Sequence, residues 1–118
     1  MKPGGYFLIV ATLGTAAFGI PVLGIAVLGM SVPAHAATIQ ISMQNLVIAP
    51  AAASAKVGDT IEWINKDILA HTATARNGDW DVTLPPNRTV KLVLKKAGTI
   101  DYYCRFNPNM KATLTVSP

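Results

Sequence analysis

The sequence predicts an all-β sandwich of seven or eight short strands, and three observations support this prediction. Several segments alternate apolar and polar residues, which is the period of a strand with one buried face. Gly, Pro, Asn and Asp interrupt these segments at short intervals. No segment after residue 36 repeats its apolar residues at the spacing of a helix. A chain of 118 residues with one cysteine therefore predicts a single small core without internal disulfides.

The first 36 residues predict an export signal or a membrane anchor, and residues 37–118 the folded domain. Lys2 supplies a positive end, residues 6–30 form an apolar run, and Ala34-His35-Ala36 matches the small-x-small pattern of a cleavage site. The apolar run is also long enough to span a bilayer if it is retained. Both alternatives place the domain on the exported side, and we expect a periplasmic protein that touches a membrane only through residues 6–30.

The first half of the domain is expected to contain four extended segments. Ile39, Ile41 and Met43 alternate in the first, and Ile61 and Trp63 are expected to point inward from the third. An alanine-rich stretch at residues 51–55 is expected to be a link, and turns are expected around Gly58, Asp67 and Gly78. The four segments are residues 38–43, 46–48, 60–64 and 68–75.

The second half is expected to contain three strands. Residues 88–94 alternate most clearly, and residues 99–104 place Ile100, Tyr102 and Cys104 on one face. A loop is expected at residues 105–110. The last strand carries its apolar residues at alternate positions, which are Ala112, Leu114 and Val116.

One set of side chains could form a metal-binding site: His71, Cys104, Asn107 and Met110. The last three recur at every third position around Pro108, a spacing that can point them to one side of a compact turn. A sandwich gathers its connections at two ends, so His71 can lie at the same end. Imidazole, thiolate and thioether are ligand types that suit copper.

The sequence also resembles the cupredoxin (blue copper) family, in particular its amicyanin/plastocyanin-like branch. The run DYYCRFNPNMKATLTV is similar to the ligand loop of that family, and KVGDTIEWINKD, AHTATA and AGTIDYYC resemble the strands before its ligands. The resemblance implies a Greek-key sandwich that binds one copper ion. It also implies His71 as the first ligand, Cys104 as the thiolate and Met110 as the weak axial ligand.

Asn107 departs from the family pattern, which has histidine at this position. An amide is a poorer copper donor than imidazole, so these residues do not complete a trigonal His₂Cys site. Three outcomes are open. Asn107 or water fills the position, or the remaining ligands hold Cu(I), or the chain has kept the fold without the metal. The loss of one imidazole disfavours Cu(II) more than Cu(I), which predicts a raised reduction potential.

The function expected from these observations is one-electron transfer to a redox partner protein by an exported monomer. One alternative is a Cu(I) carrier or buffer, and another is a metal-free β-sandwich used for binding. No phosphate-binding loop, catalytic triad spacing or carboxylate pair indicates an enzyme. The net charge of +4 is mild and unclustered, so nucleic acid is not an expected partner. Asn65 and Thr72 are candidates for hydrogen bonds around the ligands.

Overall fold

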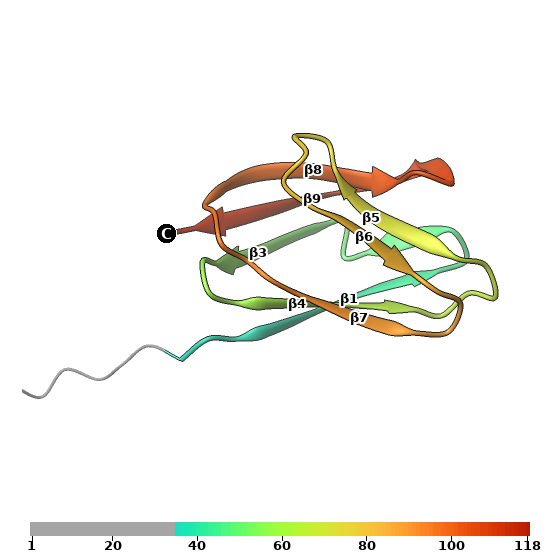
Figure 1. The fold of residues 1–118 in the computed structure, drawn as a ribbon, viewed down its shortest axis with the longest axis horizontal. Coiled ribbons are helices and arrows are strands. Elements are labelled where there is room, and N and C mark those ends of the chain that lie inside the picture. Colours follow the sequence, from blue (N-terminus) through green and yellow to red (C-terminus); the bar gives the residue numbers. More distant parts are fainter. Residues whose placement is uncertain (1–34) are drawn as a thin grey trace, which may run out of the picture. The chain divides into compact units, whose positions relative to one another are not determined.

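The computed structural model describes residues 35–118, and the predicted signal or anchor lies outside them except for His35 and Ala36. In this part of the chain nine strands form two sheets, which confirms the all-β sandwich (Figure 1). Among the same residues, no helix has the length and hydrophobicity needed to cross a bilayer. The strands are β1 (Thr38–Gln44), β2 (Val47–Ala49), β3 (Ala52–Lys56), β4 (Thr60–Asn65), β5 (His71–Ala75), β6 (Asp81–Leu84), β7 (Thr89–Val93), β8 (Gly98–Cys104) and β9 (Asn107–Ser117).

The two sheets have the strand orders β2-β1-β4-β7 and β3-β9-β8-β5-β6. Two neighbouring pairs are parallel, β1 with β4 and β3 with β9, and the other pairs are antiparallel. The β1–β2 turn, the β4–β5 connection and the β8–β9 hairpin consequently lie at one end of the sandwich (Figure 1).

The core lies between the sheets and follows the predicted alternation. Ile61 and Trp63 on β4 are fully buried, as are Tyr102 and Cys104 on β8. The Trp63 indole Nε1–H donates to the Tyr102 hydroxyl at 3.3 Å, and the two rings lie edge to face with centroids 5.8 Å apart. Met43 is also buried, which confirms its predicted role in packing.

Three stretches that were not expected as strands are strands in the structure, namely β3, β6 and the first residues of β9, so the sandwich has nine strands and not seven or eight. The alanine-rich stretch is β3, which pairs in parallel with β9 at the edge of its sheet. The small side chains of this segment show no alternation of apolar and polar residues, because the strand is held by backbone pairing and buries little apolar surface. The predicted loop at 105–110 is also wrong. Only Arg105 and Phe106 form the turn, and β9 already begins at Asn107.

The two-residue β1–β2 turn has an unusual backbone. Asn45 and Leu46 have φ values of 53° and 62°, the left-handed conformation that a tight hairpin turn requires at both positions. Asn tolerates this conformation, whereas Leu adopts it at a steric cost. The turn therefore needs support from outside itself, and that support comes from the β4–β5 connection described next.

Candidate metal centre

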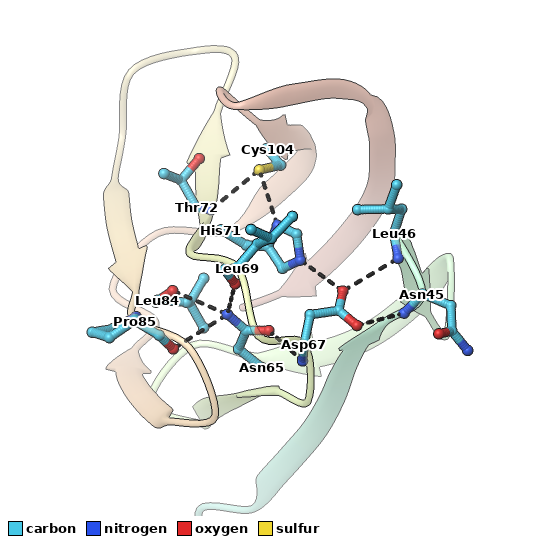
Figure 2. A network of polar contacts seen from close by, with 10 residues as sticks. All are labelled: Asn45, Leu46, Asn65, Asp67, Leu69, His71, Thr72, Leu84, Pro85 and Cys104. Carbon is cyan, nitrogen blue, oxygen red and sulfur yellow. Dashed lines mark hydrogen bonds and ion pairs between the residues drawn. The ribbon is translucent and has the colours of Figure 1, made fainter.

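His71 and Cys104 meet at the end of the sandwich where the three connections gather. His71 begins β5 and Cys104 ends β8, two neighbouring antiparallel strands. Both side chains are fully buried, and Cys104 Sγ lies 3.7 Å from His71 Nδ1 (Figure 2). The structure thus brings together two of the four residues singled out in the sequence.

Asp67 fixes the orientation of the His71 ring. The Asp67 Oδ2 atom lies 2.8 Å from His71 Nε2, on the side of the ring away from Cys104 (Figure 2). A carboxylate only accepts hydrogen bonds, so Nε2 donates to Asp67 and Nδ1 is the ring nitrogen that faces the sulfur. A carboxylate that holds the outer nitrogen in this way is the usual support of a metal-binding histidine.

The same carboxylate also supports the strained β1–β2 turn. Asp67 Oδ1 accepts the N–H of Asn45 at 2.8 Å, and Oδ2 accepts the N–H of Leu46 at 3.3 Å. The hydrogen bond from His71, followed by these two backbone donors, lowers the pKa of Asp67 below its usual value. Asp67 is therefore ionised at neutral pH and joins three segments at this end.

Asn65 holds Asp67 in place without contacting the candidate ligands. Its Oδ1 accepts the Asp67 N–H at 2.9 Å, and its Nδ2 donates to the carbonyl oxygens of Leu69, Leu84 and Pro85 (Figure 2). Because Asn65 is buried at 1% exposure, these bonds satisfy an amide that would otherwise be costly to bury. Its role is to shape the connection that carries Asp67.

Thr72 acts on the sulfur directly. Its backbone N–H points at Cys104 Sγ at 3.4 Å, and its hydroxyl oxygen accepts the N–H of Arg105 at 2.8 Å. A donor of this kind stabilises negative charge on sulfur, and the second bond fixes the hairpin that follows Cys104. The expected contribution of Thr72 therefore has a geometric basis, whereas that of Asn65 is indirect.

Asn107 and Met110 lie on the first residues of β9. Asn107 is half-buried and is the register partner of Cys104 across the hairpin. Met110 is buried at 2% exposure, just before Lys111, the partner of Tyr103. The pairing shifts between Tyr103 and Cys104, so residues 108–110 are extra on the β9 side and bulge. Pro108, which lacks an N–H, falls in this bulge.

The Cys104–His71 pair fits a metal ion of the first transition row. Metal bonds of about 2.0 Å to nitrogen and about 2.3 Å to sulfur, at angles between tetrahedral and trigonal, separate the two donors by about 3.5–3.7 Å. The observed separation is 3.7 Å. Residues 35–118 contain no group of three or more His, Cys, Asp or Glu side chains that could hold a metal. Any third donor among them must therefore be softer or weaker, such as Met110 or Asn107.

Exposed apolar side chains concentrate at this end. Ile68 is 83% exposed, next to Leu69 at 57% in the β4–β5 connection, and the exposed Phe106 lies in the β8–β9 turn beside Asn107. Leu46 and Val47 add two more on the β1–β2 hairpin. Exposed apolar side chains gathered on adjoining connections are typical of a surface that contacts another protein.

The sequence analysis did not identify Asp67 as part of the site. It assigned Asp67 to a turn, whereas the side chain is the main partner of His71. The available signal was an acidic residue four positions before the candidate histidine, within a connection too short to let the two separate.

A family model described as the cupredoxin-like domain matches residues 12–116. The methylamine utilization protein MauL of Methylorubrum extorquens is 28% identical over 91 residues, which cover 74% of this chain and 80% of that protein.

Solved structures give similar matches. A point mutant of amicyanin in its reduced state is 26% identical with a TM-score of 0.59, over 68% of this chain and 82% of that one. A purple cupredoxin from Nitrosopumilus maritimus is 26% identical with the same TM-score of 0.59, over 67% of this chain and 99% of that one.

Proposed function

The chain belongs to the cupredoxin-like domain family, and on this basis we propose that it is an exported protein that transfers single electrons through one copper ion held by His71, Cys104 and Met110. Cupredoxins are electron carriers and not enzymes, in agreement with the sequence, which gave no case for catalysis. Solved amicyanin structures are described as oxidised, reduced and Cu(I) forms. The family thus supports copper binding and electron transfer, and the assignment of the ligands is our own.

The observation that carries this proposal is the 3.7 Å pairing of Cys104 Sγ with His71 Nδ1 in a fully buried position. A copper ion held by these residues would supply the one-electron chemistry, because copper has the accessible states Cu(I) and Cu(II). Asp67 holds the imidazole with Nδ1 facing the sulfur, and the Thr72 N–H points at the sulfur. Such pre-positioned donors lower the reorganisation that accompanies a change of charge.

The surroundings of the pair suit electron exchange with another protein. His71 and Cys104 are shielded from water, whereas Phe106 and Ile68 expose apolar surface on the adjoining connections. A redox partner of unknown identity would dock at this end, and we place the protein in the periplasm, either free or anchored through residues 6–30.

A second candidate function is Cu(I) carriage without redox cycling. The observation that favours it is Asn107, which stands opposite Cys104 where a second imidazole would favour Cu(II). A soft thiolate, a thioether and one imidazole are sufficient ligands for Cu(I). The two functions share the same residues and differ in which oxidation states are stable.

A copper titration followed by visible spectroscopy tests the proposal. An electron-transfer protein should bind one equivalent, show an intense thiolate-to-Cu(II) band, and lose and regain this band on reduction and reoxidation. A carrier should hold one copper yet stay colourless and resist oxidation. If neither oxidation state binds, and thiol reagents modify Cys104 equally with and without copper, the chain is a metal-free module. A Cys104→Ser variant, which removes the thiol with a small change in side-chain size, is the matched control.

A further inference from the structure

We propose that the copper site is completed by an imidazole from a partner protein, at the position that Asn107 leaves without a strong donor. This inference rests on the proposed function, because it concerns the same metal site. It assigns a partner class: a protein that presents a histidine from an apolar surface.

The first argument is the composition of the site. His71 is the one histidine within residues 37–118, and its ring is already committed, with Nε2 on Asp67 and Nδ1 on Cys104. Within residues 35–118 the side-chain amide of Asn107 forms no hydrogen bond, so no contact in this part of the chain assigns it a structural role. A trigonal copper site requires one further nitrogen donor, and residues 37–118 contain no second histidine to provide it.

The second argument is access. Asn107 is half-buried and directly follows Phe106, which is exposed, whereas His71 and Cys104 are fully buried. The exposed hairpin turn adjoins Asn107, and apolar residues of two other connections are exposed at the same end of the sandwich. A small free ligand would gain nothing from that surface, but a protein segment would bury it, which favours a protein as the donor.

Free imidazole is the probe for the open position. Added to the copper-loaded full chain, it should shift the visible spectrum saturably in the wild type. Asn107→His fills the position and should abolish the shift, and Asn107→Ala should retain it. If copper binds but imidazole leaves the spectrum unchanged, this inference is wrong and the proposed function stands. If no copper binds, the proposed function fails and takes this inference with it.

A peptide with one histidine between leucines distinguishes a protein donor from a small ligand. It should bind more tightly than free imidazole, and Phe106→Ser should remove that advantage while leaving the affinity for imidazole unchanged. Equal affinity for the peptide and imidazole would overturn the assignment of a protein partner.

A separate observation at the opposite end of the domain carries a second inference. The backbone N–H of Ala37 donates to Asp59 Oδ1 at 2.8 Å, and Asp59 Oδ2 accepts the N–H of Lys56 at 2.9 Å. The carbonyl of Ala37 accepts the N–H of Thr60 at 2.9 Å, so Ala37 is held on both sides immediately before β1. The carboxylate that receives Ala37 is buried, with Asp59 only 6% exposed.

From this arrangement we infer that an endopeptidase cuts the chain between Ala36 and Ala37, and that Asp59 then binds the new amino terminus as an ion pair. Hydrolysis breaks the amide C–N bond, water supplies the hydroxyl to the Ala36 carbonyl carbon, and the Ala37 nitrogen takes up protons to become an ammonium. The nitrogen already faces the carboxylate, and Ala36 and Ala37 are both exposed. The small-x-small pattern Ala34-His35-Ala36 precedes this bond.

The test begins with the full chain expressed in a bacterium that exports it. The isolated product should begin at Ala37 by intact mass and amino-terminal sequencing. Its α-amino pKa, followed by NMR, should lie above the usual value of about 7.7–8.0. Lys56 is the other charge that acts on Asp59, and it lies on β3.

Asp59→Asn should return the α-amino pKa to its usual range, whereas Asp79→Asn, in another turn, should leave it raised. A first residue other than Ala37, or an ordinary α-amino pKa in the wild type, would overturn the inference. The wild-type measurement decides even if the Asp59 variant does not fold.

Discussion

Asp67 Oδ2 lies 2.8 Å from His71 Nε2, and this contact determines which ring nitrogen of His71 faces Cys104. Nε2 donates to the carboxylate, and Nδ1 is therefore the nitrogen directed at the sulfur. The candidate site thus depends on a residue that is not itself a candidate ligand.

Replacing Asp67 should weaken copper binding without removing a ligand. In Asp67→Ala the His71 ring loses the acceptor that holds a proton on Nε2, so the ring can also adopt the tautomer with the proton on Nδ1. Copper affinity should therefore fall about 10–100-fold. A competition titration with a copper chelator measures the change. Asp79→Asn, which removes a carboxylate paired with Lys96 in another turn, is the control and should keep the wild-type affinity. Equal affinities for all three proteins would contradict a positioning role for Asp67.

Asn107→His should lower the reduction potential. A second imidazole stabilises Cu(II) more than Cu(I), and the wild type lacks this donor. Voltammetry of both proteins under the same conditions measures the difference. A wild-type potential at or below that of the variant would show that Asn107 does not disfavour Cu(II).

The stability of the protein should fall in alkaline solution because of Tyr102. Burial raises the pKa of Tyr102 to about 12, against about 10 for an unfolded tyrosine. A raised pKa favours the neutral form in the folded state, so its stabilising effect is complete below pH 10 and is lost as pH rises toward 12. The difference between the folded and unfolded pKa values corresponds to a loss of at most about 3 kcal/mol in the free energy of unfolding.

Urea unfolding of wild type and Tyr102→Phe at several pH values tests this. Phe keeps the ring packed against Trp63 but cannot ionise, so the stability of the variant should decline less between pH 10 and 12. Parallel declines in the two proteins would assign the alkaline loss to other groups.

Asp59 should govern part of the acid sensitivity of the fold. The N–H groups of Ala37 and Lys56 lower its pKa below the usual value of 3.8. A lowered pKa favours the charged form in the folded state, so the stabilising effect is present above pH 4 and is lost as pH falls through the folded pKa. Asp59→Asn should be less stable at neutral pH, and its stability should fall less steeply between pH 4 and pH 2. Thermal unfolding across this range provides the measurement.

Alternation made much of the fold predictable from the sequence. Trp63, Tyr102 and Leu114 lie on strands with one face in the core, and all three are buried as expected. The edge strand β3 escaped prediction because Ala52 to Lys56 contribute backbone pairing but little apolar surface. The start of β9 escaped it because Pro108 and two asparagines are typical of a loop, and the bulge that accommodates them has no signal in the sequence.

The candidate site was predictable only as a set of residue types. Spacing placed Cys104 at a strand end and His71 near a turn, and the structure brings the two within 3.7 Å. The role of Asp67 depends on which way a five-residue connection folds, and that follows from the buried bonds of Asn65 to carbonyl groups distant in sequence. Such tertiary hydrogen bonds leave no local pattern.

The left-handed backbone at Asn45 and Leu46 has a mechanical consequence. Its two amide groups and the imidazole of His71 share one carboxylate, so a protein that presses on this hairpin while docking pulls on the same anchor that aims the ring. A displacement of the β1–β2 turn would therefore also displace the Asp67 side chain and, with it, the His71 ring.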